Sequence, residues 1–322
     1  MKTNSRVKKK KKISIIIPCY NEEAVLPQLF KRLSAAAKTW DVTWEVLCID
    51  DGSVDSTLLL LKEQNRRYSH WKFLSFSRNF GHQVAISCGL SYADGDAVVI
   101  MDADLQDPPE ELHRYIAKWQ EGYEVVYAIR KRRKEGLLKR MSYWGFYRIL
   151  SKLTNYDIPL DSGDFSIIDK KVVEILKLMP ERNKFVRGLR AWSGFKQIGI
   201  EYERNSRYAG STKYPFRKLM KLATDGIVSF SSFPLELASF FGVLISIIAL
   251  LGVFFTLLQR IFASYFKNIG IGPVPGYATT VIAILFLGGI QLVFLGIIGS
   301  YISRIYDEVK GRPHWIIKEA RL

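Results

Sequence analysis

The chain has 322 residues, of which 48% are hydrophobic, and a formal net charge of +16. That length allows one medium-sized domain with a smaller addition, and the charge indicates a polyanionic partner: nucleic acid, an anionic membrane surface or phosphorylated substrates. Three cysteines without C-x-x-C spacing and four scattered histidines argue against a disulfide framework and a zinc site.

The N-terminus is basic and then briefly apolar. Lys8–Lys12 is a lysine run, which we predict to be part of a solvated tail over residues 1–12. The apolar segment that follows, Ile13–Ile17, is too short for the core of a signal peptide and is ended by Pro18. We therefore expect the domain that follows to stay in the cytosol.

Residues 13–212 alternate strand-like and helix-like segments. Asn21, Asp55 and Asp107 are helix start signals. The strand-like segments are short and rich in β-branched or aromatic residues: Ile13–Ile17, Trp44–Ile49, Lys72–Phe76, Ala97–Met101 and Glu124–Ile129. This alternation predicts an α/β domain with a Rossmann-like, mostly parallel sheet covered on both faces. Ligands bind such sheets at the carboxyl ends of the strands.

Two long uncharged stretches follow, Leu237–Leu258 and Tyr277–Ser303. At about 1.5 Å per residue, each is long enough to cross a hydrocarbon core of about 30 Å. Buried helices of a soluble protein are the alternative, which two adjacent stretches of this length disfavour. We predict a two-helix transmembrane hairpin within residues 233–303, with helices at about 235–259 and 277–303.

The distribution of lysine and arginine predicts the topology. The connection between the spans carries only Arg260 and Lys267, whereas basic residues crowd the segments before the first span and after the second. Both termini and the N-terminal α/β domain should therefore be cytoplasmic, in a multi-pass protein of the inner (plasma) membrane. We predict an amphipathic juxtamembrane segment at 213–232 and a cytoplasmic tail at 304–322.

Acidic residues follow three of the predicted strands. Asp102 and Asp104, one residue apart, directly follow Ala97–Met101, where both can reach a hard divalent cation that also contacts substrate phosphates. A lone D-x-D is common by chance. However, Asp50-Asp51 follows the second strand and Glu22 the first, and a parallel sheet brings these ends into one crevice. The convergence indicates a nucleotide–metal site.

The order of the motifs resembles a known enzyme family. P-C-Y-N-E-E, D-D-G-S-V-D-S-T, S-R-N-F-G-H-Q and D-A-D-L-Q-D-P-P-E resemble the family 2 glycosyltransferases with a GT-A fold. More narrowly, they resemble the polyprenyl-phosphate group, which contains dolichyl-phosphate mannose synthase and bactoprenol glucosyltransferase. G-D-F-S and R-Y-A-G-S-T-K-Y agree, so the resemblance runs from Ile13 to about Pro313.

The resemblance implies the following site residues. The nucleotide would be bordered by residues after the first two strands: Pro18, Tyr20, Glu22, and Asp50 or Asp51. The metal (Mg²⁺ or Mn²⁺) and the diphosphate would be bound at Asp102, Asp104 and Gln106. The acceptor phosphate would face basic residues: Arg130, Arg140, Arg207 and Lys213.

Asp104, Arg130 and Asp164 would be the catalytic residues, with Asp164 the candidate base if there is one. A structural carboxylate at Asp164 is an equally open interpretation. Some family members have arginine after G-D-F where this chain has Ser166, so a contact made by that arginine cannot be transferred.

The function expected from the resemblance is inverting transfer of a sugar from a nucleotide donor to polyprenyl (undecaprenyl) phosphate. A UDP-linked hexose or N-acetylhexosamine is the expected donor, and a lipid-linked monosaccharide for cell-envelope glycosylation the product. The acceptor phosphate is already ionised near neutral pH and needs positioning more than a base. The identity of the sugar cannot be read from the residues.

The expected partners are the two substrates, the bilayer, further copies of the chain, a downstream flippase and a second glycosyltransferase. Nucleic acid is not expected, because no nucleic-acid-binding motif is present. One alternative is a polysaccharide synthase, which two spans and the absence of a Q-x-x-R-W motif at Leu189–Trp192 disfavour. A catalytically inactive membrane scaffold is the other, and intact Asp102 and Asp104 count against it.

Overall fold

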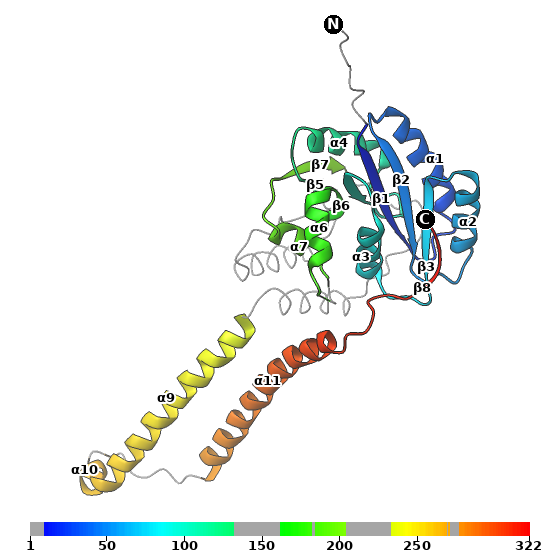
Figure 1. The fold of residues 1–322 in the computed structure, drawn as a ribbon. Helices are drawn as coiled ribbons and strands as arrows, with labels where there is room; N and C mark the ends of the chain where they lie inside the picture. Colours follow the sequence, from blue (N-terminus) through cyan, green and yellow to red (C-terminus); the bar gives the residue numbers. More distant parts are fainter. Residues whose placement is uncertain (1–9, 132–161, 182–183, 204–232, 269, 271–276) are drawn as a thin grey trace. The chain divides into compact units, whose positions relative to one another are not determined.

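The computed structural model describes residues 10–131, 162–181, 184–203, 233–268, 270 and 277–322. The chain divides into two compact units: Met1–Leu219 together with Arg312–Leu322, and Met220–Gly311 (Figure 1). Among these described residues, the first unit contains an eight-stranded sheet and the second contains two long helices.

The sheet has the strand order β7-β5-β6-β4-β1-β2-β3-β8. Its strands are β1 (Lys12–Cys19), β2 (Thr43–Asp50), β3 (Trp71–Phe76), β4 (Ala97–Ile100), β5 (Val125–Lys131), β6 (Ser162–Asp169), β7 (Gln197–Glu203) and β8 (Ile317–Arg321). Strands β1 to β4 are parallel neighbours, as predicted. Strand β6 runs antiparallel to β4 and β5, and β8 runs antiparallel to β3, so the whole sheet is mixed.

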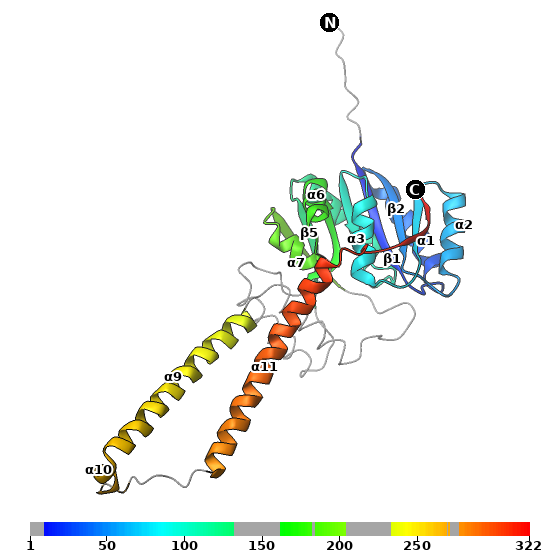
Figure 2. The same ribbon diagram turned by 60° about the horizontal axis from the view of Figure 1, so that its bottom comes forward.

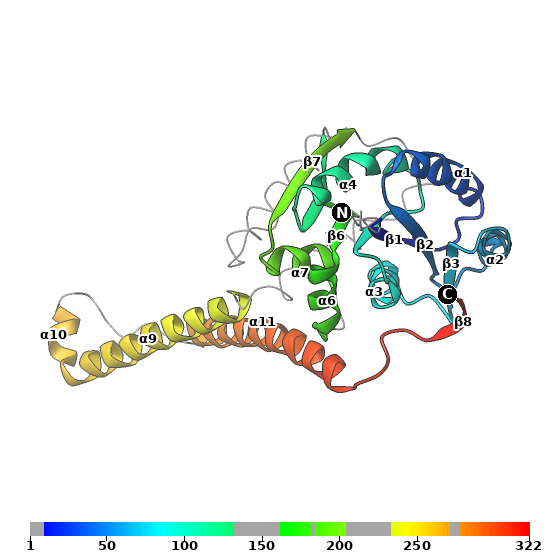
Figure 3. The same cartoon turned by 45° about the horizontal axis from the view of Figure 1, so that its top comes forward.

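Helices cover both faces of the sheet (Figure 3). One face carries α1 (Leu26–Ala36), α2 (Thr57–Arg67) and α4 (Leu112–Gln120), and the other carries α3 (His82–Tyr92), α6 (Lys170–Leu178) and α7 (Val186–Trp192). Strand β1 is buried on both sides: Ile15 and Ile16, which point to opposite faces of the sheet, are both fully buried, as expected of a central parallel strand. A Cβ on Gly89 of α3 would lie 2.3 Å from Ile16 Cγ2, so only glycine allows this close helix–strand contact.

The C-terminus differs from the prediction. The tail predicted over residues 304–322 contains β8, which adds to the sheet beside β3. Its five residues, I-K-E-A-R, have mostly exposed side chains, and such a strand leaves little hydrophobic pattern in the sequence. Backbone pairing, rather than side-chain burial, holds this segment in the domain.

The second unit contains α9 (Phe233–Ile261), α10 (Ala263–Asn268) and α11 (Tyr277–Val309), and the two long helices are visible in Figure 2. The predicted spans fall within α9 and α11. Within the part of the chain that is described, Phe286–Val309 is long and apolar enough to cross a membrane, whereas the apolar stretch of α9, Leu237–Gly252, is shorter. The membrane crossing of both helices stays a prediction.

Candidate active site

The carboxyl ends of β4, β1, β2 and β3 lie side by side because these strands are parallel neighbours. The loops that follow them carry the polar motifs singled out in the sequence. The predicted convergence of these motifs at one edge of the sheet is therefore present.

Hydrogen bonds join the loops after β1 and β2. The backbone N–H of Asn21 donates to Ser53 Oγ at 3.0 Å, and the N–H of Val54 donates to Asn21 Oδ1 at 3.0 Å. The N–H of Glu22 donates to Thr57 Oγ1 at 2.8 Å. Asn21 has φ of 55°, a left-handed conformation that asparagine adopts more readily than most residues. The P-C-Y-N-E-E and D-D-G-S-V-D-S-T motifs thus form one cross-linked surface.

Asp50 is buried and holds the loop after β2. Its Oδ1 accepts from the N–H of Ser53 at 3.0 Å, and its Oδ2 accepts from Ser75 Oγ at 2.6 Å. Both carboxylate oxygens are therefore engaged within the chain. Asp50 acts here as a structural group between β2 and β3.

Asp51 holds the S-R-N-F-G-H-Q loop that follows β3. Its carboxylate accepts from the N–H of Phe80 at 2.6 Å and from the N–H of Gly81 at 2.9 Å. Burial raises the pKa of Asp51, although these two N–H donors act in the opposite direction. The sequence left open whether Asp50 or Asp51 borders the nucleotide, and both stabilise the loops that would form its site.

Gly52 packs directly on the same loop. It has φ of +69°, and a Cβ there would lie 2.4 Å from the carbonyl carbon of Arg78 and 2.7 Å from the backbone nitrogen of Asn79. Both contacts are with backbone, which cannot move aside without shifting the loop.

Gly52→Ala is therefore expected to displace the loop after β3 and to weaken nucleotide binding by about tenfold or more, because the clash adds to a cost of about 1–2 kcal/mol for the left-handed conformation. Gly194→Ala is the matched control, since Gly194 has φ of +71° but nothing within 4 Å of its Cβ position. Calorimetric titration of both variants with UDP measures their affinities and checks the prediction. Equal affinities in the two variants would contradict it.

The loop after β4 carries the D-x-D-x-Q motif. Ala103 and Leu105 are buried, while Asp102, Asp104 and Gln106 alternate with them and are half-buried. Leu105 has φ of 58°, which is strained for a residue with a branched side chain. The apolar residues thus anchor the loop in the core and leave the three polar side chains near its surface.

The end of this loop is held by a strand that is distant in the sequence. Asp107 is 1% exposed and accepts a hydrogen bond from the hydroxyl of Tyr202 in β7. Its prediction as a helix cap is wrong, because a 3₁₀ turn, Pro109–Glu111, precedes α4 and begins after Pro108. Tyr202 therefore takes part in positioning the D-x-D loop.

The donor set of this loop fits a hard divalent cation bound together with a substrate. Among the described residues, no three histidine, cysteine, aspartate or glutamate side chains form a metal-binding cluster. Mg²⁺ is commonly bound by one or two carboxylates, with substrate phosphates and water as its other ligands. The carboxylates of Asp102 and Asp104 meet that requirement.

Asp164 of β6 forms a two-point ion pair with Arg187 of α7. Arg187 Nε lies 2.8 Å from Asp164 Oδ1, and Arg187 Nη2 lies 3.2 Å from Asp164 Oδ2. The Asp164 side chain is 9% exposed. Burial would raise the pKa of Asp164, but the charges of Arg187 and His82 outweigh burial and hold this pKa far below its ordinary value.

His82, the first residue of α3, lies between two carboxylates. Its Nε2 is 3.5 Å from Asp102 Oδ1 and 3.7 Å from Asp164 Oδ2. Burial would lower the pKa of His82, but the two facing carboxylates raise it to about 9. His82 therefore connects the D-x-D loop to the Asp164–Arg187 pair.

Arg190 lies one helical turn after Arg187 and is 1% exposed. Its guanidinium lies 5.3 Å from the ring centroid of Tyr127, and its Nε and Nη2 have no hydrogen-bond partner among the described residues. Burial lowers the pKa of Arg190 to about 10, and the negative charge of Asp164 partly offsets this lowering. The Arg190 guanidinium therefore adds positive charge to the surroundings of Asp164.

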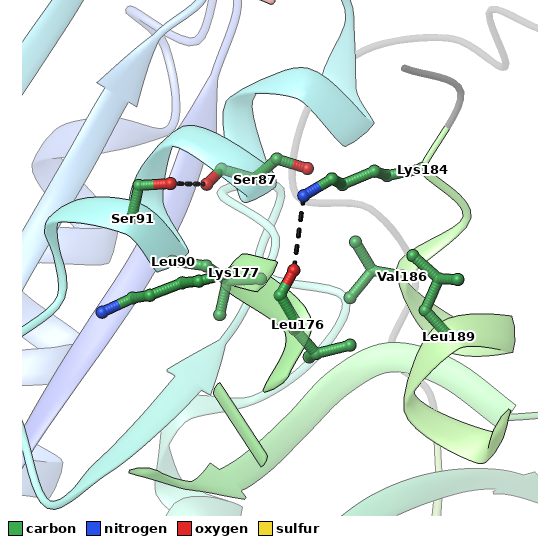
Figure 4. A pocket seen from close by; sticks show the side chains of 8 residues that line it. All are labelled: Ser87, Leu90, Ser91, Leu176, Lys177, Lys184, Val186 and Leu189. Atoms are coloured by element: carbon green, nitrogen blue, oxygen red, sulfur yellow. Dashed lines mark hydrogen bonds between the residues drawn. The ribbon is translucent and has the colours of Figure 1, made fainter. Parts of the chain in front are cut away.

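A small cavity lies on the face of the sheet that carries α3, α6 and α7, and is lined by residues of these helices and by Lys184 (Figure 4). It holds about 10 Å³, and Lys184 Nζ beside it donates to the carbonyl of Leu176 at 3.3 Å. A volume of this size accommodates about one water molecule and excludes a nucleotide.

The other predicted site residues are placed as follows. Pro18 is paired with Ile49 in the sheet, and Tyr20 is 39% exposed directly after β1. Arg130 lies in β5 opposite Tyr202, and its side chain is outside the described part of the chain. Three predicted acceptor-phosphate residues also lie outside the described residues: Arg140, Arg207 and Lys213.

The sequence reasoning did not assign roles to His82, Arg187 and Arg190. His82 stands inside the S-R-N-F-G-H-Q motif, which was noted only as part of the resemblance. Arg187 and Arg190 are three residues apart, a spacing that places both on one side of a helix. Arg190 falls within Leu189–Trp192, a poor match to Q-x-x-R-W, and Arg187 lies before that segment.

A family model described as "Glycosyl transferase family 2" matches residues 14–176, which include the loops after the four parallel strands and Asp164. The chain belongs to glycosyl transferase family 2. It has a GT-A-like α/β fold and is a transferase.

Two relatives are similar over almost the whole chain. Glycosyltransferase YkcC of Bacillus subtilis (strain 168) is 45% identical over 308 residues, which are 95% of this chain and 93% of the relative. The SfII prophage-derived bactoprenol glucosyl transferase of Shigella flexneri is 39% identical over 311 residues, covering 96% of this chain and 98% of the relative.

A solved structure, the mannosyltransferase PcManGT from Pyrobaculum calidifontis in complex with GDP-Man and Mn²⁺, is more distant. It is 19% identical, with a TM-score of 0.44, and covers 60% of this chain and 56% of its own. That likeness is too remote to say anything about ligands.

Proposed function

We propose that this chain transfers one sugar from a UDP-linked donor to polyprenyl phosphate, with inversion at the anomeric carbon and dependence on Mg²⁺ or Mn²⁺. The observation that carries the proposal is the convergence of the D-x-D loop with the cross-linked loops after β1 and β2 at one sheet edge. The alignment with a bactoprenol glucosyl transferase extends through the long C-terminal helices, which supports a lipid acceptor.

The donor would lie across the loops after β1, β2 and β4. Asp102 and Asp104 would hold the metal, with Gln106 beside the diphosphate, and the metal would neutralise the charge that develops on the leaving nucleotide. Tyr20, Glu22 and the loops held by Asp50 and Asp51 would border the base and the ribose. The protein thereby holds the anomeric carbon in line with the acceptor.

The acceptor phosphate carries its own nucleophilic oxygen, which is ionised near neutral pH. It needs orientation and charge compensation, which arginines provide. We assign these tasks to Arg130, Arg140, Arg207 and Lys213. The role that we propose for Asp164 is a fixed carboxylate that orients Arg187 and His82, because a carboxylate paired on both oxygens with a guanidinium is a weak base.

The proposed topology follows from α9 and α11. Both helices would cross the inner membrane and both termini would remain cytoplasmic. The sugar would therefore be attached at the cytoplasmic face of the membrane, where nucleotide sugars are made. The product would then require a flippase and a second glycosyltransferase. A self-assembled oligomer is part of the same proposal.

The test incubates the purified full-length protein in detergent with undecaprenyl phosphate, Mg²⁺ or Mn²⁺, and a panel of nucleotide sugars, and analyses the lipids by mass spectrometry. We expect one donor to add the mass of one sugar, and chelation with EDTA to remove the product. A ladder of several sugars would favour a polysaccharide synthase. No product from any donor with a folded protein would favour the inactive scaffold.

A further inference from the structure

The strand β8 at the end of the chain lies against the strand that leads into the candidate donor site. Strand β3 pairs with β8 in an antiparallel register that matches Ser75 with Glu319 and Phe76 with Ile317. Beyond the strand, the N–H of Ser77 donates to the carbonyl of Ile316 at 2.9 Å. The pairing therefore continues to the first residue of the loop after β3.

That loop is the one that Asp51 and Gly52 contact. Its residues Phe80 and Gly81 donate their backbone N–H groups to Asp51. The ring of Phe80 also packs on Phe76, the last residue of β3, with centroids 5.6 Å apart. The path from β8 to the D-D-G-S motif therefore consists of two short steps: backbone pairing with β3, and the loop's contacts with Asp51.

A second path runs through a side chain of β3. Ser75, which is opposite Glu319, donates its hydroxyl to Asp50 Oδ2 at 2.6 Å. Glu319 also forms an ion pair with Lys62 of α2, at 2.6 Å. Strand β8 is thus linked through β3 to Asp50 and Asp51, the two carboxylates that order the loops of the candidate donor site.

The strand adds little to the hydrophobic core. Its side chains are exposed or half-buried, so its removal opens no cavity there. It would instead leave β3 as the open edge of the sheet, with unpaired backbone groups next to the donor loops. The consequence of its removal should therefore be local to β3 and the loop after it.

We propose that β8 is a positioning element of the donor site, which orders the Ser77–Gly81 loop and through it Asp51, so that the segment after the membrane helices completes the nucleotide-binding surface. The proposal rests on the proposed function for the identity of the nucleotide. The ordering of the loop by β8 is independent of it.

The test compares three proteins purified in detergent: wild type, a chain that ends at Pro313, and a control chain that lacks only Leu322. Leu322 is exposed and lies beyond β8. Hydrogen exchange of peptides covering residues 72–81 measures the order of the loop. Calorimetry with UDP measures donor binding. Thermal unfolding checks that each protein is folded.

We expect the shortened chain to lose exchange protection at Phe80 and Gly81 and to bind UDP about tenfold more weakly, because a loop that is ordered a tenth of the time reduces apparent affinity by that factor. The control should match wild type. Glu319→Pro and Ala320→Pro repeat the test in the full-length chain: neighbouring amides of a strand point in opposite directions, so one of the two prolines must remove a donor that faces β3.

Unchanged exchange at residues 72–81 in the shortened chain and in both proline variants would overturn the proposal. The same holds if UDP affinity in them stays within twofold of wild type. If wild type itself binds no UDP, the proposed donor is wrong, and the exchange comparison alone decides whether β8 orders the loop.

Discussion

Asp104→Ala is expected to reduce kcat by about a thousandfold while leaving the protein folded. The side chain is half-buried in the loop after β4, and its carboxylate would help to neutralise the leaving diphosphate through the metal, an effect worth several kcal/mol. The substitution removes the hydrogen bond from the N–H of Gln106 to Asp104 Oδ1, but the loop keeps its anchors in the core, Ala103 and Leu105, and the Asp107–Tyr202 hydrogen bond. The initial rate of lipid-linked sugar formation at saturating substrate measures the loss of kcat.

A matched carboxylate serves as the control. Asp41 has a side chain that is 86% exposed and pairs with Lys10, outside the loops of the site, so Asp41→Asn should keep full activity. Titration with Mn²⁺ in the presence of UDP adds a second readout: Asp104→Ala should require a much higher Mn²⁺ concentration, and the control should not. Activity of Asp104→Ala within tenfold of wild type would contradict the assigned role.

The parallel core of the sheet could be predicted from the sequence because its strands are buried on both faces. Ala97–Met101 is a continuous apolar run and Ile13–Ile17 is apolar except for Ser14, and the polar loops that follow them mark the carboxyl ends of the strands. The D-x-D loop was placed correctly for the same reason. Strand–helix alternation says nothing, however, about antiparallel insertions, and neither β6 nor its antiparallel orientation was predicted.

The edge strand β8 and the hydrogen bonds of Asp50 and Asp51 could not be predicted in this way. Strand β8 consists of five mostly exposed residues whose pairing depends on the free edge of β3, about 240 residues earlier in the chain. The N–H donors to Asp51 come from a loop whose path depends on the packing of Gly52. Both features are long-range, and a local pattern carries no signal for either.

The sequence indicated Asp164 but not the two side chains that surround it, Arg187 and His82. Asp164, Arg187 and His82 come from β6, α7 and α3, and meet only because α3 and α7 cover the same face of the sheet. The sequence suggested Asp164 as a base or as a structural carboxylate. The ion pair with Arg187 makes these two roles experimentally distinguishable.

Arg187→Gln is expected to lower kcat by about a hundredfold and the free energy of unfolding by about 3 kcal/mol, because it leaves a buried carboxylate without its main partner. Arg187 is 24% exposed, so this loss should lie near the lower end of values for buried pairs. Arg114→Gln is the control, since Arg114 of α4 forms a largely solvent-accessible pair with Glu111 of the preceding 3₁₀ turn. In a double-mutant cycle with Asp164→Asn, the two effects should be far from additive.

The pH dependence separates the two roles of Asp164. In wild type the pKa of Asp164 lies below its ordinary value, so its stabilising contribution is present above the unfolded-state pKa and is lost only as the pH falls through the folded-state pKa. Without Arg187, the burial of Asp164 is opposed only by His82 and the more distant charge of Arg190, and the pKa of Asp164 rises. The activity of Arg187→Gln should then decline toward acidic pH at values where Asp164 in wild type stays ionised.

A general base would respond in the opposite direction. A carboxylate with a higher pKa is a stronger base, so above its new pKa the Arg187→Gln enzyme would match or exceed wild type. A fixed carboxylate that orients Arg187 and His82 instead predicts a lower rate at every pH, because the group that it orients is gone. Measurement of kcat for wild type and Arg187→Gln between about pH 5 and 9 decides between them, since only the sign of the change at alkaline pH has to be read.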